Sequence, residues 1–162
     1  MPGKPIFNRV AQVAMVVRDL DKSVREYWDL CGIGPWRIYR YDSSTSKETI
    51  LNDQPGEYAM RLALTRVGDV SWELIQPLDE KSIYARFLRE HGEGLHHVLF
   101  DVDDYDDTIA YFRSKGIGVA QGGQLGQISF TYFDTEDRLL FPAEIIRRDK
   151  EGELPPPGAT YP

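Results

Sequence analysis

The chain has 162 residues, of which 41% are hydrophobic and 28% are charged. This length and composition are typical of one globular domain with its own core. The formal net charge of −7 argues against nucleic acid and anionic lipid as main partners, because both require a basic surface. No apolar run approaches the roughly 20 residues of a membrane span, and the single cysteine, Cys31, excludes an internal disulfide. We therefore expect a cytoplasmic protein that acts on a small molecule and binds neither nucleic acid nor a membrane.

The sequence contains two copies of one unit. Gln12–Asp21 and His97–Asp106 are apolar runs that each end in an acidic turn, and each is followed by a helical pattern and the tripeptide Gly-Ile-Gly. Asp21 and Asp106 are the expected N-caps, since a short carboxylate accepts hydrogen bonds from the free amides of a first helical turn. The first glycine of each tripeptide is expected to end its helix in a left-handed turn.

Each copy continues with further strand candidates, so each half reads as a strand, a helix and about three more strands. Besides the two opening strands, we expect helices at 22–30, 80–91 and 107–114, and strands at 58–66, 72–75, 128–133 and 143–146. The whole chain is expected to form one domain, with a first module at about 8–77, a linking helix at about 80–91, a second module at about 94–148 and a proline-rich tail at 152–162.

Three segments differ in composition from the predicted helices and strands. The polar stretch Tyr41–Gly56 is expected to be a long loop with a short strand at Thr49–Leu51. Gly122–Gly126 is expected to be a flexible loop at the edge of a pocket, because no helix start follows its glycines. The tail, Gly152–Pro162, is expected to be extended because of its prolines.

Four polar side chains occupy matching places in the two copies. Side chains alternate between the faces of a strand, so Gln12 lies opposite to the packed face of the first strand and His97 takes the same place in the second copy. Glu73 and Glu144 each interrupt an apolar strand, where a lone buried carboxylate is costly. Each of the four, taken alone, is more often a solvated or structural residue. Together they supply three oxygens and one nitrogen, which suits one divalent ion such as Zn, Ni, Co or Mn.

These segments resemble a known family. The segment GLHHVLF at Gly94–Phe100, a first strand ending in VRDLD, and the glutamates of SWELIQP and FPAEII are similar to those of the vicinal oxygen chelate superfamily. The resemblance covers Arg9 to Arg147 and is greatest to methylmalonyl-CoA epimerases. It implies an α+β fold in which paired βαβββ modules form a cupped mixed β-sheet around a metal site. It also implies a homodimer and gives the ligand roles to the four residues above.

Two departures from the epimerase pattern bear on the reaction. The ligand order Gln, Glu, His, Glu looks like that of eukaryotic glyoxalase I, whereas epimerases have His first and Gln second. The second catalytic glutamate of the epimerases is expected near Ala59–Arg61, and the sequence has none there. The ligand order also argues against the iron-dependent dioxygenases, which use two histidines and one carboxylate.

We expect from these residues a metal-dependent isomerase or epimerase that moves a proton next to a carbonyl through a metal-stabilised enediolate. Glu144 is the expected base. Arg61 is a weaker candidate for binding a substrate carboxylate or phosphate, and a solvated strand arginine is the simpler interpretation. Two alternatives stay open: a glyoxalase I-like lyase that acts on the thiol adduct of a 2-oxoaldehyde, and a non-catalytic protein that binds a small molecule.

Overall fold

The computed structural model describes residues 3–148 and 154–162. The strands are β1 (Arg9–Val16), β2 (Trp36–Tyr41), β3 (Ser46–Leu51), β4 (Gln54–Pro55), β5 (Met60–Val67), β6 (Val70–Pro77), β7 (Gly94–Asp101), β8 (Val119–Leu125), β9 (Ile128–Phe133), β10 (Ala143–Arg148) and β11 (Ala159–Tyr161), and the helices are α1 (Leu20–Cys31), α2 (Ile83–His91), α3 (Tyr105–Ser114) and α4 (Glu136–Leu139). The strands form one curled sheet in the order β11-β2-β5-β6-β1-β7-β10-β9-β8-β3-β4.

The central part of this sheet consists of two βαβββ units joined through their first strands. The first unit contributes β2, β5, β6 and β1, and the second contributes β7, β10, β9 and β8. In each unit the first strand runs parallel to the last strand, and β1 and β7 pair in antiparallel orientation where the units meet. The predicted α+β fold of paired βαβββ modules is confirmed.

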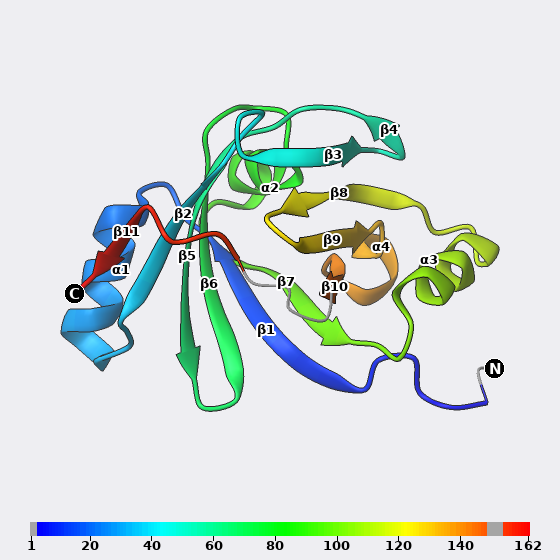
Figure 1. Ribbon diagram of the computed structural model, residues 1–162, viewed down its shortest axis with the longest axis horizontal. Helices are drawn as coiled ribbons and strands as arrows, with labels where there is room; N and C mark the ends of the chain where they lie inside the picture. Colours follow the sequence, from blue (N-terminus) through cyan, green and yellow to red (C-terminus); the bar gives the residue numbers. More distant parts are fainter. Residues whose placement is uncertain (1–2, 149–153) are drawn as a thin grey trace.

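Each unit extends the outer edge of the other. The hairpin β3–β4 follows β2 of the first unit, yet β3 pairs with β8 of the second unit. The strand β11 follows the second unit, yet it pairs with β2 of the first unit. Figure 1 shows both additions, in cyan beside β8 and in red beside β2. Segments of this chain therefore cover both outer edges of the eight central strands.

The helices close the fold on three sides. α1 and α3 lie at opposite ends of the molecule (Figure 1), each packed on an apolar cluster that includes Val24 for α1 and Phe112 for α3. α2 contributes Ile83 and Tyr84 to a third cluster, which lies beneath the concave face of the sheet. None of the helices in the described part of the chain is long and apolar enough to cross a membrane.

The helices begin at other residues than predicted. α1 is capped by Asp19 and α3 by Asp104, and each carboxylate accepts from the amide three residues further on. The N-caps predicted at Asp21 and Asp106 are therefore wrong by two residues. Both turns contain several acidic residues, and the earlier one has the extended backbone that an N-cap requires. α2 likewise begins after Ser82, later than predicted.

The predicted helix ends are confirmed. Gly32 after α1 and Gly116 after α3 have φ values of 64° and 73°, in the left-handed region that glycine adopts without a Cβ clash. Gly92 follows α2 and donates its amide to the Leu88 carbonyl.

Two segments predicted as loops are strands. β3 is longer than the short strand expected at Thr49–Leu51, because its backbone pairs with β8. Gly122–Gly126 is not a flexible loop, since β8 continues to Leu125. Its glycines have a packing reason, because a Cβ at Gly123 would collide with the Tyr41 hydroxyl. The tail from residue 154 reaches β11 without regular structure, and residues 152 and 153 lie outside the described part.

Candidate active site

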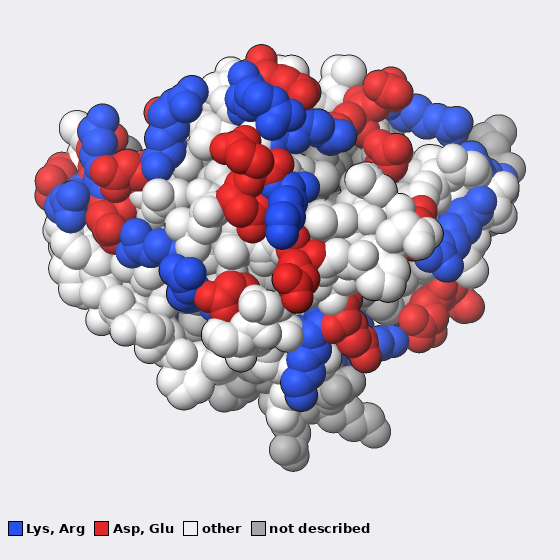
Figure 2. Space-filling model, turned by 90° about the horizontal axis from the view of Figure 1, so that it is seen from above, with Lys and Arg blue, Asp and Glu red and all other residues white. Residues whose placement is uncertain are grey.

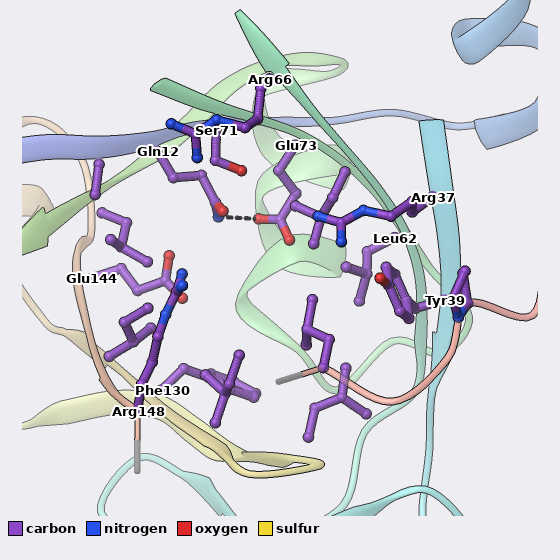
Figure 3. A pocket seen from close by; sticks show the side chains of 18 of the residues that line it. Gln12, Arg37, Tyr39, Leu62, Arg66, Ser71, Glu73, Phe130, Glu144 and Arg148 are labelled. Carbon is purple, nitrogen blue, oxygen red and sulfur yellow. Dashed lines mark hydrogen bonds between the residues drawn. The ribbon is translucent and has the colours of Figure 1, made fainter. Parts of the chain in front are cut away.

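The four candidate metal ligands converge on the concave face of the sheet. Glu73 of β6 and His97 of β7 pair with the same residue of β1, Ala14, from its two sides. Gln12 of β1 and Glu144 of β10 flank one residue of β7 in the same way. Side chains at paired positions project from the same face of a sheet, and Figure 3 shows Gln12, Glu73 and Glu144 pointing into one cavity.

The polar atoms of these side chains are in contact. The Gln12 Nε2 donates to the Glu73 Oε2 at 2.8 Å. The His97 Nε2 lies 3.3 Å from the Glu73 Oε2 and 3.2 Å from the Glu144 Oε2. Both glutamates and the histidine are buried. Two carboxylates thus meet at one imidazole nitrogen away from solvent.

The charges of this cluster shift its pKa values. Burial alone would lower the pKa of His97, but the neighbouring Glu144 and Glu73 carboxylates outweigh it and raise the pKa to about 9. Burial raises the pKa of Glu73, and His97 opposes part of that change. The neighbouring carboxylates thus favour the protonated form of His97.

The donor set suits a divalent cation. The His97 Nε2 and the Glu144 Oε2 are buried without a hydrogen-bond partner among the described residues. Donors that share an ion at about 2.0–2.2 Å lie roughly 3 Å apart, which is the spacing found here. The described residues contain no ready-made shell of three or more His, Cys, Asp or Glu ligands, so an ion would replace the direct contacts between these groups. The Gln12 amide would turn to present its oxygen.

Gln12, Glu73 and Glu144 line a cavity of about 720 Å³, which is within the usual range for a small-molecule site. His97 contacts the two glutamates but is not itself part of the cavity wall. Its inner walls are aromatic and aliphatic, and Tyr39, Leu62 and Phe130 are labelled in Figure 3. Arginines line its mouth, and the tail segment from Leu154 to Pro157 forms one side. The polar cluster is therefore reached through a charged entrance and an apolar interior.

Comparison with known proteins assigns the chain to a family. A family model described as the glyoxalase/bleomycin resistance protein/dioxygenase superfamily matches residues 11–132. The chain belongs to this superfamily. The match includes β1, β6 and β7, which carry three of the four candidate ligands.

Two mitochondrial methylmalonyl-CoA epimerases are also similar to the chain. The mitochondrial methylmalonyl-CoA epimerase of Homo sapiens is 25% identical over 111 residues, covering 68% of this chain and 55% of the human protein. The enzyme of Bos taurus is 26% identical over 122 residues, covering 73% of this chain and 62% of its own length. The chain thus spans less than two thirds of the length of these relatives.

Solved structures share the superfamily fold. The methylmalonyl-CoA epimerase of Mycobacterium tuberculosis has a TM-score of 0.66 and 22% identity, covering 93% of this chain and 95% of that one. A methylmalonyl-CoA epimerase in complex with methylmalonyl-CoA and ammonium has a TM-score of 0.64 and 23% identity, covering 92% and 99%. At these identities the likeness establishes the fold.

The strand β5 carries no carboxylate into the cavity. Its cavity-lining residues are Met60, Leu62, Leu64 and Arg66. The second glutamate that the superfamily's epimerases are expected to have near this strand is therefore without a counterpart there. The remaining cavity-lining aspartates, Asp69 and Asp101, lie at the mouth, where Asp101 accepts from the Arg9 guanidinium at 2.7 Å.

The structure does not bring Arg61 to the cavity. Its neighbours Met60 and Leu62 line the cavity, so Arg61 projects from the opposite face of β5. There it donates two hydrogen bonds of 2.8 Å to the Asp21 carboxylate. Arg61 is thus a structural ion-pair residue, and we do not propose it again for substrate binding.

Sequence reasoning missed the arginines that do line the cavity, which are Arg9, Arg37, Arg66 and Arg148. The alternation of side chains along a strand could have indicated Arg66. It is separated from Arg61 by an odd number of positions, so the two side chains lie on opposite faces of β5. The position of Arg37 in the cavity could not be predicted in this way, because the sequence pattern does not predict the strand β2.

Proposed function

We propose that this protein is a metal-dependent isomerase that transfers a proton at the carbon next to a carbonyl group. The observation that carries the proposal is the cluster of Gln12, Glu73, His97 and Glu144, three of which line a cavity of small-molecule size. Similarity to proteins named methylmalonyl-CoA epimerase supports the same reaction class.

In this proposal Gln12, Glu73 and His97 hold a divalent ion, and Glu144 is the fourth donor. When bound, a divalent ion such as Zn, Ni, Co or Mn would supply electrophilic stabilisation for negative charge on the substrate oxygen. Glu144 also lines the cavity, so one of its carboxylate oxygens takes the proton from carbon and holds it for return. Tyr132, paired with Glu144 across β9 and β10, helps to exclude water.

With Glu73 assigned to the ion, the cavity favours one base rather than two. Met60 and Leu62 are apolar where a second base would be needed on β5, and Asp69 and Asp101 lie at the mouth. With one base, Glu144 returns the proton to the same face of the substrate from which it took the proton. We infer that the product differs from the substrate by a proton moved between neighbouring atoms, and that two-base inversion is the less favoured version of the reaction.

A second candidate is a glyoxalase I-like reaction on the thiol adduct of a 2-oxoaldehyde. The order of the donors, Gln12, Glu73, His97 and Glu144, favours it, since this order resembles that of eukaryotic glyoxalase I. The two candidates share the metal, the base and the proton transfer, and they differ in the substrate.

The test is elemental analysis of the purified protein, followed by proton–deuterium exchange on two substrate panels. One panel contains acyl-CoA thioesters, including methylmalonyl-CoA, and the other contains thiohemiacetals of 2-oxoaldehydes. Exchange in one panel identifies the substrate class. A protein that takes up no divalent ion, even after reloading, and exchanges neither panel would overturn the proposal in favour of a non-catalytic binding protein.

A further inference from the structure

Arginine side chains gather at the mouth of the cavity. The charged residues there are Arg9, Arg37, Arg66, Arg148, Asp69 and Asp101. Outside the ligand cluster these four arginines stand against two aspartates, whereas Glu73 and Glu144 bring the carboxylates of the whole lining to four. On the face of the molecule in Figure 2, by contrast, acidic and basic side chains are interspersed. Arginine thus predominates among the charged lining residues outside the ligand cluster.

Arg37 lies on the same cross-strand row as two of the candidate ligands. It pairs with Leu64 of β5, Leu64 pairs with Glu73 of β6, and Glu73 is linked through Ala14 to His97. Strands are separated by about 4.8 Å, so the Arg37 backbone lies roughly 10 Å from that of Glu73. Figure 3 shows the Arg37 side chain reaching into the cavity from β2.

Arg66 is likewise connected by cross-strand pairs to a candidate ligand. It pairs with Ser71, which pairs with Gln12. Arg66 and Arg37 are diagonal neighbours on β5 and β2, because Arg37 pairs with the residue two places before Arg66. Diagonal neighbours are about 7–8 Å apart and within reach of long side chains. Both guanidinium groups can thus contact one anion.

These two arginines lack the carboxylate partner that their outward-facing neighbours have. Arg40 of β2 pairs with Asp42, and Arg61 of β5 pairs with Asp21. Within the described residues Arg37 forms no ion pair, and the Arg66 guanidinium donates one bond, to the Asp69 main-chain oxygen at 2.8 Å. Arg37 and Arg66 thus differ from the cavity-lining Arg9, which is paired with Asp101, in having no carboxylate partner among the described residues.

We propose that Arg37 and Arg66 bind an anionic group of the substrate, a carboxylate or a phosphate. The planar guanidinium fork matches the oxygens of both groups. This inference deepens the proposed function and rests on it for the other end of the substrate, where oxygen atoms meet the ion near Glu73. The substrate class is then a short compound with a carbonyl head and an anionic end.

The test measures binding of phenyl phosphate and of phenylacetate to the full-length protein by calorimetry. Neither probe has a chelating head, and their comparison distinguishes phosphate from carboxylate recognition. We expect Arg37→Gln and Arg66→Gln each to weaken binding of the preferred probe by about 10-fold or more, the scale of a lost charge-assisted hydrogen bond. Arg40→Gln is the matched control, because it removes an arginine from the other face of β2.

Equal affinities for wild type, Arg37→Gln and Arg66→Gln would overturn the inference, as would an equal loss in Arg40→Gln. Acetohydroxamate, a chelator with no anionic group besides the one that binds metal, separates this result from the fate of the proposed function. If acetohydroxamate fails to bind the metal-loaded protein while phenyl phosphate still depends on Arg37, the anion site stands and the metal site fails. If Arg37→Gln loses binding of the anionic probe but still binds acetohydroxamate as the wild type does, the result supports both the anion site and the metal site.

Discussion

The Nδ1 atoms of His96 and His97 lie 2.9 Å apart, so that one imidazole donates a hydrogen bond to the other. An ion on the His97 Nε2 leaves the His97 Nδ1 protonated and makes His96 the acceptor. Burial lowers the pKa of His96 well below its usual range, which keeps this ring neutral and able to accept. His96 thus sets the orientation and tautomer of the candidate ligand beside it.

Replacing His96 by Phe is expected to weaken binding of the ion by about 10- to 100-fold, the usual cost of losing a group that orients a ligand. The ring volume is kept, so thermal unfolding should change much less. Competition with a chelator of known affinity measures the effect. His91→Phe is the control, because His91 lies at the end of α2. An unchanged affinity for the ion would remove His96 from the site.

His97→Ala should abolish binding of the ion while the protein stays folded. We expect about one divalent ion per chain in the wild type and none in the variant, as measured by elemental analysis, with similar circular dichroism spectra. An equal metal content in both proteins would show that the ion is held elsewhere.

Glu144→Gln tests the proposed base. The amide keeps an oxygen donor and nearly the same shape, so the ion should stay bound, more weakly. Catalysed exchange of the substrate's carbon-bound proton should fall by about 100-fold or more, since a general base contributes on that scale. Exchange at the wild-type rate would leave Glu144 as a ligand only and would direct the search for the base to Glu73.

The metal-free protein should lose stability in mildly alkaline solution. The pKa of His97 is raised from its usual 6.5 to about 9 in the folded protein. The stabilisation from protonated His97 is therefore complete below pH 6.5 and disappears as the pH rises through 9. Urea unfolding after chelation, at pH 6 and pH 9.5, measures the loss. His97→Gln should flatten this pH dependence, and an unaltered dependence in the variant would contradict the assignment.

We also expect a homodimer. The resemblance to the vicinal oxygen chelate superfamily motivates this prediction, and sedimentation equilibrium at micromolar concentration tests it. Because the edges of the eleven-stranded sheet are the short strands β11 and β4, contact between protomers should involve faces of the molecule. The mass of a single chain across the concentration range would rule the dimer out.

The local pattern of the sequence was sufficient to predict the two units and the shared face of four donors. Strand parity put Gln12 opposite to the apolar side of its strand, and the repeat put His97 at the equivalent place. Glu73 and Glu144 stood out because a carboxylate is costly within an apolar strand. These signals depend on neighbours within one strand or on the comparison of two copies, and both can be read without knowing the fold.

The features that escaped prediction depend on contacts between distant segments. Nothing local marks β3 as a partner of β8 or β11 as a partner of β2. Arg37 lies on a strand whose parity the sequence did not reveal, and its role depends on the row that joins it to Glu73. The predicted N-cap positions were wrong because each turn contains several acidic residues that could cap the helix. In the first turn the backbone geometry selects Asp19 rather than Asp21.

The pairing of β11 with β2 has a consequence for the order of events during synthesis. β2 comes early in the chain, at Trp36–Tyr41, whereas β11 comes at Ala159–Tyr161. As the chain leaves the ribosome, the outer side of β2 has unpaired backbone groups until residues 159–161 emerge. Such an open strand is a template for pairing with other chains. The N-terminal half is therefore expected to be prone to misassociation while translation is still under way, and to become protected only when residues 159–161 have docked.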